Sequence, residues 1–415
     1  MDVKIYPSKL IGTLNAPSSK SYSHRMIIAA ALAGGISEIS NVTGSNDIKV
    51  TAGAMEALGA DVLADGDVYT VRGIKDPAAK ADIDCGESGS TLRFIIPVAA
   101  ALGTNATFRG HGKLPERPYT PYVREFSKKG ISFEPQSGLP MTISGRLTAG
   151  EYLLEGDVSS QFITGLLLAL PIAEEETTIH VPHVISTPYI DITIDTAERF
   201  GIEILHKDYK EFYVAGGQRY RPAEFEIESD WSAAAFLLVA GAVAGEVTIR
   251  NLSVLSRQAD TAVMTALIRA GASVIDEGDT ITVAHRPLQA FSFDATQCPG
   301  LFPALAALAA SAEGTSVIKG TSRLENKEGN RAESIREEYA KLGIEVDLDE
   351  EDTMKIRGGR IRGGHVHSHD DHRIAMSLAV AALNADTPVV IENPACVAKS
   401  FPDFFERLES LRTVE

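Results

Sequence analysis

The chain has 415 residues, of which 44% are hydrophobic and 23% charged, a composition typical of globular proteins and a length that favours two domains. Its formal net charge of −17 argues against a general nucleic-acid binder, because phosphate backbones are held by net basic surfaces. The sequence has no apolar run of the roughly 18 residues that a membrane span needs, and it begins without a signal-peptide or transit-peptide pattern. Three widely spaced cysteines favour a reducing compartment. We therefore expect a cytoplasmic protein with no membrane or nucleic-acid partner.

The first predicted elements are a strand in "MDVKIYP" and a helix that begins in "NAPSSKSYSHR", residues 15–25. Ser21 or Ser23 could simply cap this helix. One cap requires only one polar side chain, so it does not explain the cations Lys20 and Arg25 beside it. A helix N-terminus attracts anions through its free amides and its dipole. The stretch therefore predicts an anion-binding helix start.

Similar polar or cationic groups open three later predicted helices. These groups are Ser88, Ser90 and Arg93, then Ser159, Ser160 and Gln161, and finally Asp371, His372 and Arg373. Further cations lie in predicted loops, at Lys113, Arg117, Lys327, Arg331 and Lys399. Because the whole chain is acidic, this clustering predicts a local cationic site for an anionic ligand.

The chain also repeats itself with a period close to 70 residues. One block is an Ala/Leu-rich helix, a turn and a strand, as in "WSAAAFLLVAGAVAGEVTIRN". A second block is a helix, a glycine and an alternating strand, and its glycines are Gly59, Gly130, Gly201, Gly271 and Gly343. Each glycine suits a helix C-terminal cap. Solenoid repeats usually span about 20–50 residues, so the longer period favours closed domains.

The repeats predict an α/β fold of six units, three in each of two domains. One domain is expected over 1–16 plus 228–415 and the other over 20–225, with crossovers near 15–20 and 222–230. The sixth unit is split, because "FFERLESL" lacks a following strand and "MDVKIYP" lacks a preceding helix. We therefore expect both termini to complete one unit.

The histidines of "HVHSHDDHR" could be mistaken for metal ligands. Alternating histidines on a strand can chelate, but neither H-E-x-x-H nor a comparable spacing is present. We therefore expect no metal site.

Seven motifs now show a resemblance to a known family. They are "PSSKSYSHR", "LPERP", "GDVSSQFITGLL", "ISTPYIDIT", "NKEGNR", "DDHRIAM" and "AKSFPDFFERL". In order and spacing they resemble the EPSP synthases, the 3-phosphoshikimate 1-carboxyvinyltransferases of the shikimate pathway. The resemblance covers essentially the whole chain and implies a two-domain inside-out α/β barrel. It also implies enolpyruvyl transfer from phosphoenolpyruvate to the 5-hydroxyl of shikimate 3-phosphate, with phosphate released, no metal or organic cofactor, and a monomer.

The resemblance also implies roles for individual residues. It places shikimate 3-phosphate against Lys20, Ser21, Arg25, Ser159, Ser160, Gln161, Ser186, Tyr189 and Lys327. It places phosphoenolpyruvate against Lys20, Gly89, Arg117, Gln161, Arg331, Arg373 and Lys399. It implies catalytic roles for Lys20, Glu328 and Lys399, with Lys20 and Glu328 taking part in proton transfer.

Two positions depart from the family pattern. The family has an aspartate, its favoured base, where "QCPGLFPAL" places Gly300, and Asp294 is the nearest acid in sequence. General acid–base groups contribute typically about 10²–10⁴-fold, so impaired activity is expected unless another group compensates. Glu87 stands where many members have asparagine, and it would repel phosphoenolpyruvate unless it turns away or pairs with a cation.

Two alternative functions stay open at this point. A UDP-N-acetylglucosamine enolpyruvyl transferase would share the fold, but that family has a catalytic cysteine in the loop that here reads "RGHGKLPERP". A catalytically silent relative would bind phosphorylated ligands without turnover, and Gly300 is its only support.

Overall fold

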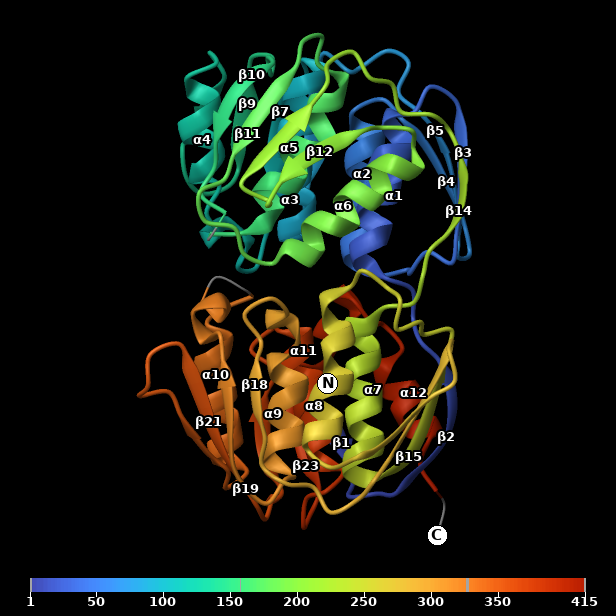
Figure 1. The fold of residues 1–415 in the computed structure, drawn as a ribbon, viewed down its shortest axis with the longest axis vertical. Coiled ribbons are helices and arrows are strands. Elements are labelled where there is room, and N and C mark those ends of the chain that lie inside the picture. Colours follow the sequence, from blue (N-terminus) through green and yellow to red (C-terminus); the bar gives the residue numbers. More distant parts are fainter. Residues whose placement is uncertain (1, 157, 326–327, 414–415) are drawn as a thin grey trace. The chain divides into compact units, whose positions relative to one another are not determined.

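The computed structural model describes residues 2–156, 158–325 and 328–413. The chain forms two compact units (Figure 1). The terminal unit comprises Met1–Pro17 and Ser229–Glu415, and the central unit comprises Ser18–Glu228. In the part of the chain that the structure describes, no helix is both long enough and apolar enough to span a membrane.

The central unit contains three four-stranded sheets. In spatial order, the first is β14 (Glu224–Glu226), β3 (Ile36–Ser40), β5 (Val68–Arg72) and β4 (Asp61–Asp65). The second is β6 (Lys80–Asp84), β7 (Asn105–Arg109), β9 (Met141–Ser144) and β8 (Ser132–Glu134). The third is β10 (Gly150–Leu153), β11 (Thr177–His180), β13 (Glu211–Val214) and β12 (Ile204–Lys207). Each sheet has one parallel pair followed by two antiparallel pairs, so the same unit recurs three times.

The terminal unit repeats this plan with one difference. One sheet is β2 (Leu10–Asn15), β15 (Gly245–Arg250), β17 (Thr280–Ala284) and β16 (Ser273–Asp276). Another is β18 (Ser292–Asp294), β19 (Gly314–Lys319), β21 (Thr353–Gly358) and β20 (Glu345–Asp347). The third has three strands, β22 (Gly364–His367), β23 (Val389–Glu392) and β1 (Val3–Ile5). Because β1 pairs antiparallel with β23, the first strand of the chain completes the sheet of the last repeat.

Each unit has almost fully buried helices among its sheets and further helices that keep an exposed face (Figure 1). The central unit has α1 (Lys20–Leu32), α2 (Asn46–Ala57), α3 (Gly89–Leu102), α4 (Thr120–Ser127), α5 (Ser160–Ala169) and α6 (Thr187–Arg199). The terminal unit has α7 (Trp231–Ala244), α8 (Val263–Arg269), α9 (Phe302–Ala310), α10 (Arg331–Lys341), α11 (His372–Ala382) and α12 (Phe404–Ser410). Short 3₁₀ segments are η1 (Leu114–Glu116), η2 (Leu170–Ile172), η3 (Ala259–Ala262), η4 (Pro299–Leu301), η5 (Thr321–Leu324) and η6 (Pro394–Lys399).

Each unit has its own core, built around helices that are apolar on almost every face. In α7, α9 and α11 nearly every residue is buried, and many of them are alanines. Small side chains let these three helices pack closely against one another, and hydrophobicity on all sides of a helix is typical of a fully buried position. The sequence prediction of an inside-out α/β fold is confirmed.

The glycines of the repeat occupy the predicted helix ends. All five have a positive φ angle: Gly59, Gly130, Gly201, Gly271 and Gly343. The left-handed conformation at a helix C-terminus favours glycine because it has no Cβ. Each glycine lies one or two residues after the C-cap residue of its helix, so the prediction that these glycines follow helix ends is confirmed.

One testable consequence concerns the core of the central unit. The buried hydroxyl of Tyr122 on α4 lies 2.8 Å from the carbonyl oxygen of Arg93 and 2.9 Å from that of Phe162. Tyr122→Phe removes the donor that joins α4 to α3 and α5, and we expect the free energy of unfolding to fall by about 1–3 kcal/mol. Urea denaturation followed by circular dichroism measures this change.

The matched control is Tyr213→Phe, because Tyr213 is 41% exposed and its hydroxyl contacts Glu211 at the surface. We expect the control to change stability by less than about 0.5 kcal/mol. Equal effects of the two substitutions would contradict the structural role of the Tyr122 hydroxyl.

Candidate active site

The buried helices of the central unit begin with serine caps. The Ser88 hydroxyl accepts a hydrogen bond from the amide of Thr91 at the start of α3 (3.1 Å), and Ser159 accepts one from Gln161 at the start of α5 (3.3 Å). The cap of α1 is Ser19, so the suggestion that Ser21 or Ser23 caps this helix is wrong. The helix begins two to four residues earlier than that suggestion requires, and the Ser23 hydroxyl donates back to the Ser19 carbonyl.

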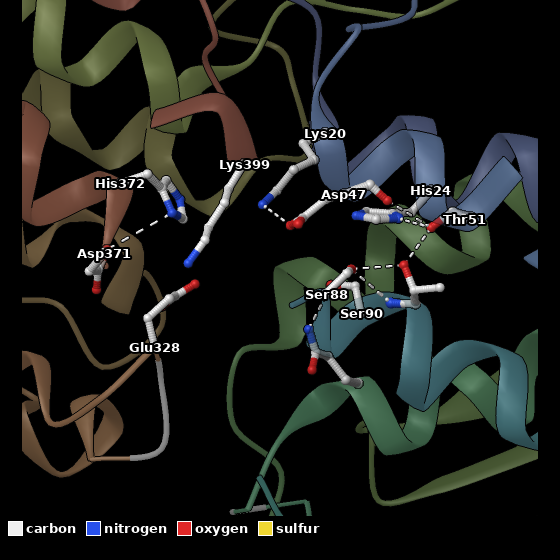
Figure 2. Close-up of polar contacts among 12 residues, drawn as sticks. Lys20, His24, Asp47, Thr51, Ser88, Ser90, Glu328, Asp371, His372 and Lys399 are labelled. Atoms are coloured by element: carbon white, nitrogen blue, oxygen red, sulfur yellow. Dashed lines mark hydrogen bonds and ion pairs between the residues drawn. The ribbon is translucent and has the colours of Figure 1, made fainter. Parts of the chain in front are cut away.

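Lys20 is the first residue of α1, and its amine is held by an acid on the next helix. Its Nζ lies 2.7 Å from Oδ2 of Asp47, which lies in the first turn of α2 (Figure 2). The two side chains are 20% and 14% exposed, so the pair is partly shielded from water. Lys20 is therefore oriented by Asp47, a residue that the sequence analysis did not include in the site.

Buried hydroxyl groups connect α2, which carries Asp47, to α1 and α3. Thr51, one turn after Asp47 on α2, lies 2.7 Å from Nδ1 of His24 and 2.6 Å from the hydroxyl of Thr91 (Figure 2). Burial, with the charges of Lys20 and Arg25, lowers the pKa of His24 well below its usual value. His24 is therefore neutral at pH 7 and fixes α1 against α2 without adding charge.

Arg25 is almost fully buried, with 3% of its surface exposed. Its guanidinium donates to the hydroxyls of Thr193 and Thr164 and to the backbone oxygens of Ser21 and Tyr189. Burial lowers its pKa to about 10, so it stays charged at pH 7. Arg25 thus ties the start of α1 to α5 and α6.

The starts of α3 and α5 are joined by Gln161. Its amide oxygen accepts from Arg93 (2.7 Å) and its amide nitrogen donates to the hydroxyl of Ser90 (2.8 Å). At Gly89, a Cβ would lie 2.7 Å from Nη1 of Arg117, so the absence of a side chain lets that guanidinium approach α3. Arg93 belongs to this group, although the predicted ligand set omits it.

The remaining predicted residues of the central unit lie at the starts of two helices. Ser160 is a buried residue in the first turn of α5. Ser186 precedes α6 in a left-handed conformation with φ of 60°, and Tyr189 lies in the first turn of that helix. Lys327 lies outside the described residues.

Arg331, a predicted cation of the terminal unit, is paired with two carboxylates at the start of α10. Arg331, the first residue of α10, donates from Nε (2.7 Å) and Nη2 (3.0 Å) to the two oxygens of Asp371. Its Nη2 also donates to Glu328 at 2.6 Å. The side chains of Arg331 and Asp371 are 3% and 4% exposed, so this two-point pair is buried.

The same aspartate organises the start of α11. Asp371 is the N-cap of α11 and accepts from the amide of Arg373 at 2.8 Å. Nearby, the largely buried Lys399 at the end of η6 donates to the backbone oxygen of Asp370 at 2.6 Å. The contacts through residues 370–371 therefore hold three of the predicted cations near one helix start.

The two departures from the family pattern have distinct surroundings. Gly300 is buried in η4, and a Cβ at this position would lie 2.1 Å from Nη1 of Arg373. Asp294 is exposed and accepts from the amide of Thr296, so its carboxylate is engaged in a turn. Glu87 lies 3.9 Å from Nε2 of His111, toward the loop that follows β7.

One group of three potential metal ligands occurs among the described residues: Glu337, Glu338 and His369. Only one of the four histidines of "HVHSHDDHR" belongs to it. Lys341 forms ion pairs with both glutamates, at 3.4 and 2.8 Å. Its ammonium group already supplies the positive charge that two carboxylates require, so the group gives no support for a metal centre.

Solved structures show the class of this fold. An EPSP synthase from Acinetobacter baumannii matches with a TM-score of 0.83 at 26% identity, covering 99% of this chain and 98% of that chain. The enolpyruvyl transferase NikO from Streptomyces tendae matches with a TM-score of 0.79 at 19% identity, covering 99% and 97%. The fold is that of the enolpyruvyl transferases.

Sequence comparisons identify the family within this class. The EPSP synthase family model, 3-phosphoshikimate 1-carboxyvinyltransferase, matches residues 5–408. Proteins named 3-phosphoshikimate 1-carboxyvinyltransferase match from Clostridium kluyveri at 41% identity and Clostridioides difficile at 38%, each covering 99% of this chain and 97% of the relative. The chain belongs to the EPSP synthase family. It is an enolpyruvyl transferase of the shikimate pathway, which serves aromatic amino acid biosynthesis.

The buried pair of Arg331 and Asp371 predicts a large effect on stability. Asp371→Asn keeps a cap for α11 but leaves a buried guanidinium with less compensating charge. We expect the free energy of unfolding to fall by about 3 kcal/mol, at the lower end of the range for broken buried pairs because Glu328 still contacts Arg331. Urea denaturation measures the change.

The control is a pair with the same two-point geometry at the surface. Arg109 contacts both oxygens of Asp82, and these side chains are 54% and 61% exposed. We expect Asp82→Asn to cost less than about 1 kcal/mol. A cost as large as that of Asp371→Asn would show that burial does not set the strength of these pairs.

Proposed function

We propose that this chain transfers the enolpyruvyl group of phosphoenolpyruvate to the 5-hydroxyl of shikimate 3-phosphate. Its family membership supports this reaction, and the helix starts supply the chemistry that two small polyanions need. The starts of α1, α3, α5 and α11 each present backbone amides, and α1, α3 and α11 carry cations in their first two turns, which suits phosphate and carboxylate groups. The observation that carries the proposal is this set of cations in a chain of net charge −17.

Shikimate 3-phosphate is assigned mainly to the central unit. The hydroxyls at the start of α5 and the group around Arg25 present donors of the kind that a phosphate and a ring carboxylate accept. The assigned ligands are Lys20, Ser21, Arg25, Ser159, Ser160, Gln161, Ser186, Tyr189 and Lys327. Because Arg25 already donates to four protein acceptors, we assign its main effect to fixing the helix starts around the ligand.

Phosphoenolpyruvate is assigned mainly to cations that carboxylates hold in place. The assigned ligands are Lys20, Gly89, Arg117, Gln161, Arg331, Arg373 and Lys399. Guanidinium groups suit this substrate because they bind phosphate and carboxylate oxygens at two points. Gly89 contributes by its lack of a side chain, which leaves room for Arg117.

The reaction requires two proton movements at carbon. The 5-hydroxyl of shikimate 3-phosphate loses its proton and adds to C2 of phosphoenolpyruvate, forming a C–O bond, while a proton adds to the methylene carbon to give a tetrahedral intermediate. Loss of a proton from the resulting methyl group and cleavage of the C–O bond to phosphate then give the product. We assign the carbon-bound proton to Glu328, and we assign Lys20 and Lys399 to stabilising the negative charge that develops on oxygen.

Gly300 limits the addition step, in which the attacking hydroxyl must lose its proton. At this position the family aspartate would accept the proton of the attacking hydroxyl, and glycine offers no acceptor. We propose that turnover is slower than it would be with a carboxylate at residue 300.

We also propose that the enzyme acts as a cytoplasmic monomer without a nucleic-acid partner or a metal. The acidic net charge and three free, buried cysteines are consistent with this assignment. The crossovers near residues 15–20 and 222–230 remain the proposed domain boundaries.

Replacing Lys20 separates catalysis from stability. Lys20→Ala is expected to lower kcat by about 10²–10⁴-fold, because a charge that stabilises the reacting oxygens is lost. Its partly exposed pair with Asp47 contributes little to folding, so the stability change stays within about 1 kcal/mol. Phosphate release and urea denaturation measure the two effects. The control is Lys49→Ala on the exposed side of α2, which leaves the rate unchanged; an unchanged rate in Lys20→Ala removes Lys20 from the mechanism.

Adding a carboxylate at residue 300 tests the missing base. We expect Gly300→Asp to raise kcat at saturating substrates by about 10²-fold or more, since a positioned base contributes about 10²–10⁴-fold. Gly300→Asn is the matched control, because it has nearly the same shape and cannot accept the proton. A wild-type kcat that Gly300→Asp does not exceed means that another group is the base. Binding of shikimate 3-phosphate without turnover in both proteins would favour the silent-relative alternative.

A further inference from the structure

Gly300 leaves a space that the end of the Arg373 side chain occupies, and its backbone conformation does not require glycine. Its φ angle is not among the positive values of this chain, so an L-residue could adopt the backbone. A Cβ at this position, however, would lie 2.1 Å from Nη1 and 3.0 Å from Cζ of Arg373, and 2.9 Å from Oδ2 of Asp260. Real Cβ atoms do not approach other atoms so closely. Any side chain at residue 300 must therefore displace the Arg373 guanidinium from its present place.

Asp260 is the acid that faces this space from η3. Its side chain is 1% exposed, and its Oδ2 accepts a hydrogen bond from the hydroxyl of Ser232 and lies 3.6 Å from Nη1 of Arg373. Its other oxygen has no hydrogen-bond partner among the described residues. Burial and the negative charge of Asp230 raise the pKa of Asp260, whereas Arg373 opposes the rise. The positive charge of Arg373 therefore favours the ionised form of this buried carboxylate.

Arg373 is correspondingly fixed at two points. Its backbone amide donates to Asp371 at the start of α11, and its guanidinium faces Asp260. Among the described residues, Nη1 has no hydrogen-bond partner in addition to this ion pair. The ion pair thus orients the guanidinium, while 16% of the Arg373 side chain stays exposed.

We propose that Asp260 is a positioning residue for Arg373, and that it holds the guanidinium for the enolpyruvyl donor in the space that Gly300 leaves open. The proposal rests on the proposed function, in which Arg373 binds phosphoenolpyruvate. Asp260 does not touch substrate; it acts through the orientation of Arg373. Gly300 and Asp260 therefore act on the same group, one by leaving space and the other by charge.

The proposal predicts a specific kinetic signature. Asp260→Asn removes the charge that holds Arg373, and Gly300→Ala fills its space without supplying a base. For each variant we expect the KM for phosphoenolpyruvate to rise about tenfold to a hundredfold, because a displaced Arg373 guanidinium binds this substrate poorly. The KM for shikimate 3-phosphate and kcat at saturation stay within about twofold of the wild type, because Arg373 is not assigned to that substrate or to proton transfer.

The double variant tests whether the two residues act through one group. In Gly300→Ala/Asp260→Asn the guanidinium is already displaced by either change. The combined rise in KM should therefore be clearly smaller than the product of the two single effects. A full product would show that the residues act independently and would overturn the proposal.

Matched controls come from the same unit. Asp294→Asn neutralises an exposed acid that serves only a turn, and Gly364→Ala adds a Cβ whose nearest atom is 3.7 Å away. Both controls should leave every kinetic constant unchanged. Thermal unfolding of all variants is followed by circular dichroism.

The outcomes separate this proposal from the proposed function. No phosphate release by the wild type would be a failure of the proposed function itself. An active wild type with an unchanged KM for phosphoenolpyruvate in Asp260→Asn would overturn the positioning role alone. A fall in kcat with unchanged KM would also overturn it, and would place Asp260 in proton transfer. Equal loss of affinity for both substrates with a lower melting temperature would show a merely structural role.

Discussion

The pairing of buried and partly buried cations with carboxylates at helix starts is the constraint on which the site depends. Lys20, Arg331 and Arg373 lie at helix N-termini, where the helix dipole is also positive. A cation in such a place is unfavourable unless an acid compensates it. Asp47, Asp371 and Asp260 supply that compensation, at 2.7, 2.7 and 3.6 Å. The carboxylates therefore let a folded chain keep positive charge where anionic substrates need it.

The repeated architecture explains why helix starts provide so many of these groups. The buried helices of each unit are mostly apolar along their length, so their N-terminal ends are the places where many polar groups enter the interior. Serines cap α1, α3 and α5 in the central unit, whereas aspartates cap α7 and α11 in the terminal unit. The acidic caps occur in the unit that contains Arg331, Arg373 and Lys399. An acidic cap can serve two purposes: the carboxylate of Asp371 both caps α11 and pairs with Arg331.

Much of the fold could be predicted from the sequence, because the repeat is a periodic signal. The Ala-rich blocks became the buried helices, and the glycines of the second block became helix caps with positive φ. The α/β fold class and the family followed from patterns that extend over the whole chain. Such signals survive local ambiguity because each repeat supports the others.

The counter-ions could not be predicted in the same way. Asp47 and Asp260 read as ordinary acids near helix starts, and their partners are 27 and 113 residues away in the chain. The burial of Arg25 likewise depends on Thr193 and Thr164, which only the packing of α5 and α6 brings close. Only one consequence of Gly300 could be predicted from the sequence. The missing base follows from a motif, whereas the nearby guanidinium of Arg373 is evident only in the structure.

The choice of acceptor tests the account most directly. Purified enzyme would be given phosphoenolpyruvate with either shikimate 3-phosphate or UDP-N-acetylglucosamine, with phosphate release and the mass of the product followed together. The account predicts phosphate only with shikimate 3-phosphate, in equal amount to its enolpyruvyl ether. Phosphate release with UDP-N-acetylglucosamine, or no phosphate release with either acceptor, would contradict this assignment.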